Sequence, residues 1–335
     1  MTRFLLRRLA WMVVVIWGVV TLTFVISHMV PADPARLAAG VHAGATQVAS
    51  ARKQFGLDKP IDVQYLIYVK GVAQGHLGTS LVTRRPVLQD LLAYWPATIE
   101  LTLFALLVYV VIGIPAGIVS AMYRNSVLDQ GTRVAALFGA SMPAFWFGLL
   151  LQLVFAKALG WFPLSGRLGL FSTPPPHVTG LYLIDSLLTG KWQDLVGTLH
   201  HLVLPGITLG LTSIAFVMRL SRASLLEVLG RDYIRTARSK GLSQVRTVLV
   251  HGLRNALFPI ITLTGLQIGS LMGGAVLVED IFDWPGIGRY ALQSVERMDF
   301  PAIMGVTLGV SVVYVVVNLI VDLIYMLVDP RIRYD

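Results

Sequence analysis

The sequence has no cysteine, and only 13% of its 335 residues carry a charged side chain. The missing cysteine excludes disulfides, thiolate metal sites and a cysteine nucleophile. No Gly-x-x-x-x-Gly-Lys-Ser/Thr phosphate loop occurs, and the seven histidines form no metal-ligand spacing such as His-Glu-x-x-His. We therefore expect no catalytic residue, no metal site and no cofactor bound by this chain.

Apolar residues, by contrast, are abundant. They make up 55% of the chain, and the mean hydropathy is +0.71, far above the average of soluble proteins. The net charge of +9 would by itself fit a nucleic-acid partner, but the positive-inside rule places an excess of basic residues on one side of a membrane protein. The composition predicts a polytopic membrane protein whose partner is the lipid bilayer and not nucleic acid.

Six apolar stretches predict an all-α membrane protein with six transmembrane helices, since each can cross a hydrocarbon core of roughly 30 Å. They cover about residues 9–30, 98–122, 134–159, 201–220, 256–278 and 302–328. The first stretch exceeds the apolar core of a secretory signal, so we interpret it as a retained helix that starts in the cytoplasm. Pro143 falls inside the third stretch and is expected to kink that helix.

Loop charges provide a check on orientation. Residues 219–254 contain seven arginines and one lysine against two acids, whereas residues 279–301 contain five acids against two arginines. The positive-inside rule then places residues 219–254 in the cytoplasm and residues 279–301 outside. Six spans in this orientation leave both termini in the cytoplasm.

The expected domain organisation follows from these spans. Residues 1–30 form the first transmembrane helix and residues 31–96 an extracytoplasmic domain, because roughly 65 residues without structure would be unusual. Residues 97–328 form a five-helix transmembrane core that includes a cytoplasmic loop at 221–254, and residues 329–335 form a cytoplasmic tail. The domain at 31–96 includes one modestly amphipathic stretch and could be a lid on the helices.

The basic segment from Asp232 to Pro259 predicts two short helices joined by an elbow. Asp232 is expected to cap a helix that starts at Tyr233, and Gly241 to end it in the left-handed conformation. Ser243 is then the N-cap of a second helix. Such an elbow offers a compact projection to a protein partner, or its basic side chains bind anionic lipid headgroups. Those side chains are Arg235, Arg238, Lys240, Arg246 and Arg254.

Motifs along nearly the whole chain carry a family resemblance. They are Leu5-Leu6-Arg7-Arg8-Leu9, Pro31-Ala32-Asp33-Pro34, Phe55-Gly56-Leu57-Asp58-Lys59-Pro60, Arg235-Thr236-Ala237 with Gly241, Leu253-Arg254-Asn255-Ala256-Leu257-Phe258-Pro259, Glu279-Asp280-Ile281-Phe282-Asp283-Trp284-Pro285-Gly286-Ile287-Gly288-Arg289, Asn318, Asp322 and Asp329-Pro330-Arg331. In order and spacing they resemble permeases of binding-protein-dependent ABC importers, in the dipeptide and oligopeptide branch. The general signature of these importers begins Glu-Ala-Ala, and Arg235-Thr236 replaces its first two residues. Only Ala237 and Gly241 match, so the role of that glutamate cannot be carried over.

The resemblance implies the type I ABC importer permease fold, with an extracytoplasmic insertion after helix one, in the inner membrane. It implies a permease subunit that forms half of a pathway for di- or oligopeptides, or, in related permeases, for glutathione, nickel complexes or another small solute. A self-contained channel and a membrane-embedded hydrolase remain as remote alternatives. The implied partners are a second homologous permease, two ABC ATPase subunits that hold ATP and Mg, and an extracytoplasmic peptide-binding protein that residues 31–96 would help receive. The residues that would couple to the ATPase are Asp232, Tyr233, Ile234, Arg235, Thr236, Ala237, Arg238, Lys240 and Gly241.

Two further patterns lie within the predicted spans. Gly265, Gly269 and Gly273 form a ridge without side chains, which either packs inside this chain or meets the second permease along the pathway. Asn318 and Asp322 lie one turn apart on helix six, where an ionisable group needs a partner. We interpret them as a structural anchor that pairs with one of three arginines, and a proton or substrate site is the alternative. The three arginines are Arg219, Arg254 and Arg331.

Overall fold

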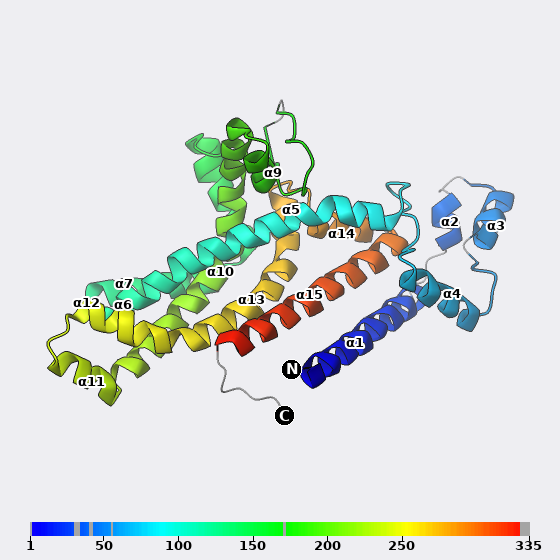
Figure 1. Ribbon diagram of the computed structural model, residues 1–335. Coiled ribbons are helices and arrows are strands. Elements are labelled where there is room, and N and C mark those ends of the chain that lie inside the picture. The colour runs from blue at the N-terminus through cyan, green and yellow to red at the C-terminus, as the bar shows by residue number, and fades with distance from the viewer. Residues whose placement is uncertain (1, 30–33, 40–42, 55, 170–171, 329–335) are drawn as a thin grey trace. The chain divides into compact units, whose positions relative to one another are not determined.

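The structure is a computed structural model that describes residues 2–29, 34–39, 43–54, 56–169 and 172–328 (Figure 1). Every regular element in these residues is a helix, and one isolated β-bridge joins Thr79 and Pro86. The all-α prediction is confirmed. The tail at 329–335, with Arg331, and residues 31–33 lie outside the described residues. The chain divides into two units, residues 1–95 with 289–335, and residues 96–288.

The first unit contains the two terminal long helices and the short helices that follow the first of them. They are α1 (Thr2–Met29), α2 (Pro34–Ala39), α3 (Ala45–Gln54), α4 (Ile61–Ala73) and α15 (Phe300–Val328). Helices α5 (Val87–Val108) and α14 (Ile287–Glu296) have residues in both units. Within the first unit α15 packs along α1. The loop before α5 is held by Asp299, whose carboxylate accepts hydrogen bonds from Ser80 Oγ at 2.5 Å and from the Val82 N–H at 3.2 Å.

The second unit is built around α10 (Trp192–Leu229), which packs against most of the other helices of this unit. The other helices that lie wholly in this unit are the π-helical segment η1 (Tyr109–Gly113), α6 (Ile114–Met122), α7 (Val127–Ser141), α8 (Ala144–Leu151), η2 (Gln152–Ala158), α9 (Tyr182–Leu188), α11 (Asp232–Ser239), α12 (Gln244–Arg246), η3 (Thr247–Gly252) and α13 (Leu253–Ile281). Buried apolar residues line α10 at three levels, represented by Leu202, Val217 and Leu225. One continuous helix therefore joins the core of this unit from end to end.

Five helices in the described part of the chain are long and apolar enough to cross a membrane, or six if the bent pair of α7 with α8 and η2 is one span. Several helices extend beyond the apolar stretches that predict them. Helix α10 covers residues 192–229 where 201–220 was expected, and α5 starts at Val87 where about residue 98 was expected. The additional turns of α10 include the polar residues Gln193 and Asp194. Those of α5 are mostly apolar but precede Pro96, a residue that normally interrupts a helix and that lies inside α5 here.

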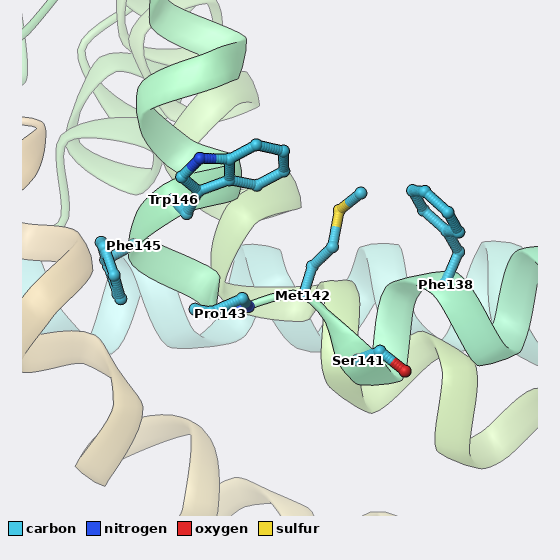
Figure 2. Close-up of a pocket in the computed structure, with 6 residues that line it drawn as sticks. All are labelled: Phe138, Ser141, Met142, Pro143, Phe145 and Trp146. Atoms are coloured by element: carbon cyan, nitrogen blue, oxygen red, sulfur yellow. The ribbon is translucent and has the colours of Figure 1, made fainter.

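The expected kink at Pro143 is instead a complete break, and the prediction of a continuous third helix was wrong. Helix α7 ends at Ser141, Met142 and Pro143 are extended, and α8 starts at Ala144, at 106° to α7. The physical reason is local, because a residue before proline is driven out of the helical conformation. Figure 2 shows Phe138, Met142 and Trp146 projecting to one side of the corner. With Ser141, Pro143 and Phe145 they line an apolar hollow of about 470 Å³.

Glycines bring several helices of each unit close together. A Cβ atom at Gly117 would lie 2.5 Å from the Met218 carbonyl oxygen and 2.6 Å from Ser221 Cβ, and a Cβ at Gly206 would collide with the Phe104 ring. Glycine at these positions lets the helices approach closely without intervening side chains.

We predict that Gly117→Ala lowers the free energy of unfolding by about 1–3 kcal/mol, because the methyl group meets backbone that cannot move away easily. Gly131, inside α7, is the matched control, since a Cβ there meets nothing within 4 Å. Gly131→Ala should be neutral or stabilising by up to about 1 kcal/mol through helix propensity. Thermal unfolding of both variants in one detergent measures the difference. Equal melting temperatures would contradict the close-packing argument.

Candidate functional site

The basic elbow starts with α11, whose two faces differ sharply. Ile234 and Ala237 are buried, whereas the remaining side chains of the helix are exposed. The prediction that Asp232 caps this helix was wrong, because Arg231 is the N-cap residue and no side chain makes a cap hydrogen bond. Asp232 is the first helical residue, and its carboxylate lies 3.5 Å from Arg235 Nη1. An acid in the first turn still interacts favourably with the helix dipole.

The elbow itself has the predicted geometry. Gly241 adopts φ +78°, and the N–H of Leu242 donates to the Ala237 carbonyl at 3.4 Å, so the helix closes through a left-handed residue. A Cβ at Gly241 would meet nothing within 4 Å, which shows that backbone conformation and not space requires glycine here. Ser243 is an N-cap as predicted, since its hydroxyl accepts the Arg246 N–H at 3.4 Å.

The second helix of the elbow is continuous with the membrane helix that follows. Residues 244–281 form α12, η3 and α13 without an intervening loop. Asn255 Nδ2 donates a hydrogen bond to the Tyr233 hydroxyl at 2.8 Å, which ties α11 to the first turn of α13. Val248 is fully buried beside Leu225 of α10. Helix α11 also packs against η3, so it is attached to a segment that runs directly into α13.

The outward face of the elbow is basic and largely unneutralised. Its ion pairs are exposed, with Arg231 at 2.6 Å from Glu227 and Arg235 at 3.5 Å from Asp232, and pairs of this kind contribute little. Arg238, Lys240 and Arg246 are also exposed. This face suits an acidic partner surface.

A buried ionic cluster next to the elbow was missed from the sequence. Asp129 of α7 is fully buried, and Arg222 of α10 donates to its two oxygens at 2.7 and 2.9 Å. The Ser120 hydroxyl at 2.6 Å and the Asn125 N–H at 2.9 Å complete the cluster. Ser126 lies three residues before Asp129, a spacing that indicates the start of a helix. Nothing in the sequence pattern indicates that Arg222 lies opposite Asp129.

The glycine ridge of α13 has two environments. Gly265 is buried and Gly269 half-buried by this chain, whereas a Cβ at Gly273 would meet nothing within 4 Å. Packing inside the chain therefore accounts for the first part of the ridge. The part near Gly273 is open.

Asp322 is anchored by Arg8 and, within the described residues, by neither Arg219 nor Arg254, whereas the third expected arginine, Arg331, lies outside the described residues. Its carboxylate lies 2.8 Å from Arg8 Nη2, because α15 packs along α1 and brings the first turns of α1 beside it. Asn318, one turn away, is half-buried. The sequence gives no sign that the first and last helices are neighbours, so it could not indicate Arg8.

The Glu279 to Gly288 motif folds back on itself at the far end of α13 from the elbow. The buried Glu279 carboxylate accepts a hydrogen bond from Thr98 Oγ1 at 2.5 Å. A Cβ at Gly286 would collide with this carboxylate, and one at Gly288 would lie 2.9 Å from its Oε2. Trp284 is fully buried and donates to the Ala97 carbonyl at 2.9 Å. The two glycines of the motif leave the space that Glu279 occupies.

The loop between η2 and α10 is held by two buried acids. Arg167 pairs with Glu100 at 2.6 Å and lies over the Tyr182 ring at 3.5 Å. Asp185 accepts hydrogen bonds from the Thr179 N–H and hydroxyl, each at 2.7 Å, and from the N–H groups of Val178 and Gly180 at 3.3 and 2.9 Å. Burial alone would raise the pKa of Asp185, but these hydrogen bonds outweigh it and hold the pKa below its ordinary value.

Taken together, the fold and the elbow define a multi-span membrane protein with an exposed basic helix. The family described as "Binding-protein-dependent transport system inner membrane component" matches residues 113–334, and its N-terminal counterpart matches residues 1–102. The chain belongs to this family, which confirms the resemblance, the type I importer permease fold and the expectation that the chain is not itself an enzyme. Membership implies partnership with a substrate-binding protein and an ATPase.

Curated relatives match over their full lengths. A probable D,D-dipeptide transport system permease protein of Escherichia coli is 48% identical over 329 residues, which cover 98% of this chain and 97% of the relative. A dipeptide transport system permease protein of Alkalihalophilus pseudofirmus is 43% identical over 334 residues, with 100% of both chains covered. A glutathione transport system permease protein of Escherichia coli is 40% identical over 334 residues, again with full coverage.

The Tyr233 to Asn255 hydrogen bond can be tested by a double-mutant cycle. Tyr233→Phe and Asn255→Ala should each lower the local stability of α11 by about 0.5–1.5 kcal/mol, the usual net contribution of one hydrogen bond. The double variant should lose no more than the larger single loss, since both changes remove one interaction. Hydrogen exchange at residues 232–239 provides the measurement. Simple additivity would show that the two side chains do not interact.

The hydrogen bonds to Asp185 predict an acid-sensitive loop. Because its folded pKa is below the unfolded value, the stabilisation is complete above about pH 4 and is lost as the pH falls through the lowered folded pKa. Asp185→Asn should accelerate hydrogen exchange at residues 177–189 at neutral pH, at a cost of about 1–3 kcal/mol. It should also remove the acid sensitivity of this segment. The same pH dependence in the variant would point to another group.

Proposed function

We propose that the chain is the permease subunit of an ATP-driven ABC importer and forms half of the pathway for di- or oligopeptides. The observation that carries this proposal is the end-to-end match to dipeptide permeases, at 43% and 48% identity. The glutathione permease is less similar at 40%, although glutathione is itself a small peptide derivative. Glutathione and other small solutes, including nickel complexes, are therefore the alternative cargo of the same fold.

The assembly that we propose has one further permease homologous to this chain, two ABC ATPase subunits and an extracytoplasmic peptide-binding protein. ATP and Mg are held by the ATPase subunits and not by this chain. Both termini and the basic elbow lie in the cytoplasm, an orientation that the excess of arginine in residues 219–254 supports. The open part of the α13 ridge, near Gly273, faces the second permease along the pathway.

In the mechanism that we propose, α11 sits in a groove of an ATPase subunit. The exposed basic face meets acidic groups of that subunit, while Ile234 and Ala237 hold α11 against its own chain. Closure of the ATPase dimer on ATP then displaces α11. The Asn255 bond and the continuity of residues 244–281 pass this displacement into α13.

The pathway opens outward in the ATP-bound state, so that peptide enters from the binding protein. ATP and loaded binding protein both favour this state, and such differential affinity is what moves a conformational equilibrium. The Asp129 to Arg222 cluster supports the mechanism because it stiffens the junction of α6, α7 and α10 beside the elbow. If the junction of α6, α7 and α10 were flexible, a displacement of α11 would deform this junction and would not be passed on to α13.

Affinity purification of the tagged chain from its native membrane tests the proposal. A second six-span permease, P-loop ATPases and a binding protein should co-purify, and the binding protein should release dipeptides when it is denatured. Recovery of the chain alone would contradict the proposed ATP-coupled mechanism, because no ATPase subunit would be present to drive it. A binding protein that carries glutathione and binds no dipeptide would leave the mechanism intact and change the cargo.

Two substitutions at Gly241 separate backbone conformation from side-chain volume. Gly241→Val should reduce ATP-dependent uptake by about tenfold, since left-handed strain of roughly 1–2 kcal/mol opposes the elbow. Gly241→Asn should retain most uptake because asparagine tolerates this conformation. Uptake into proteoliposomes, at equal levels of inserted protein, measures the effect. Normal transport by the valine variant would count against the proposal that displacement of α11 is passed into α13.

A further inference from the structure

Helix α4 is largely apolar, yet its own chain leaves Ile61, Leu66 and Ile67 exposed. Apart from Asp62, Gln64 and Lys70, its residues are aliphatic, aromatic or glycine, and none is buried. Leu66 is 65% exposed and Ile67 49% exposed. A helix that is largely hydrophobic favours an apolar environment. With 13 residues, α4 is too short to span a bilayer and has the length of a buried or interfacial segment.

Two tyrosines attach α4 to the side of α1. The Tyr65 hydroxyl is 2.7 Å from Thr21 Oγ1, and the Tyr68 hydroxyl is 3.4 Å from Thr23 Oγ1. The Phe24 ring lies against both tyrosine rings, with centroid distances of 5.3 and 5.8 Å. The attachment therefore combines hydrogen bonds with aromatic packing, and both come from the same face of α4.

These contacts place α4 alongside the candidate span of α1. Residues 6–29 of α1 form a candidate membrane span, and Thr21 precedes the end of that span, Met29, by eight residues. At 1.5 Å per residue, Thr21 lies about 12 Å inward along the helix. Helix α4 thus packs beside the spanning part of α1 and not beyond its end.

The exposed residues of α4 continue an exposed apolar surface of α1. Leu22, Val25 and Ile26, on the same stretch of α1 as the threonines, are 59%, 45% and 52% exposed. Side chains at this depth of a span contact lipid or another membrane helix. Lys70, which is exposed, supplies the kind of polar group that membrane-interface helices typically direct toward headgroups.

We propose that α4 is a membrane-embedded interfacial helix in the leaflet nearer Met29, with Leu66 and Ile67 in contact with lipid acyl chains. The occupant of this surface is the bilayer, because the surface is continuous with that of a membrane span and sits at its depth. This part of residues 31–96 is then an anchor in the membrane. The inference is independent of the cargo and of the ATPase.

Spin labelling tests the proposal directly, and the absence of cysteine makes each variant a single-thiol protein. The full-length chain carrying Leu66→Cys or Ile67→Cys is labelled and reconstituted in lipid nanodiscs. Collision rates are measured with oxygen, which concentrates in lipid, and with a water-soluble nickel chelate. Leu22→Cys on α1 is the lipid-facing control, and Thr46→Cys, exposed on α3, is the aqueous control.

Labels at 66 and 67 should match the Leu22→Cys control, with high oxygen accessibility and nickel accessibility several-fold below that of Thr46→Cys. Nickel accessibility equal to the Thr46→Cys control would overturn the proposal. Low accessibility to both reagents after assembly with the other subunits would assign the surface to a protein partner and also overturn it. A decrease seen only after the binding protein is added would show a docking surface instead.

Discussion

The cost of an unpaired charge in a low-dielectric interior governs how the helices of this chain are joined. Four acids within helices reach a group on a different segment. Asp129 meets Arg222, Glu100 meets Arg167, Glu279 meets Thr98, and Asp322 meets Arg8. Close packing of glycines then brings the backbones together around these fixed points. The few charges of the chain therefore specify which helices are neighbours, while the abundant apolar residues supply the cohesion.

The elbow region has a rigid part, the junction of α6, α7 and α10, and a less firmly attached part, helix α11. The Asp129 cluster leaves α6, α7 and α10 little scope to move, because its carboxylate is satisfied on both oxygens. Helix α11, in contrast, presents an exposed basic surface and is attached by two buried side chains and one hydrogen bond. A projection of this kind is well suited to move as a unit. Its attachment to α13 determines where such a movement goes.

Local chemistry was read from the sequence more successfully than tertiary pairing. Gly241 and Ser243 act at the predicted positions because turn and cap preferences depend on the residue itself. Asp232 failed as a cap because Arg231 already has the extended conformation of an N-cap, and the helix starts one residue early. The break at Pro143 was underestimated because the apolar run continues through it. Arg8 could not be found, since pairing between helix ends far apart in sequence leaves no local pattern.

The fold of the Glu279 motif has a consequence for how such sequences can change. Because a side chain at Gly286 or Gly288 would take the volume of the Glu279 carboxylate, these three positions are not independent sites of variation. Shortening residue 279 would free that volume but leave the Thr98 hydroxyl without its acceptor. A substitution at Glu279, Gly286 or Gly288 alone is therefore expected to be destabilising unless the other two positions change as well. Replacement of the motif would therefore require coordinated substitutions at Glu279, Gly286 and Gly288.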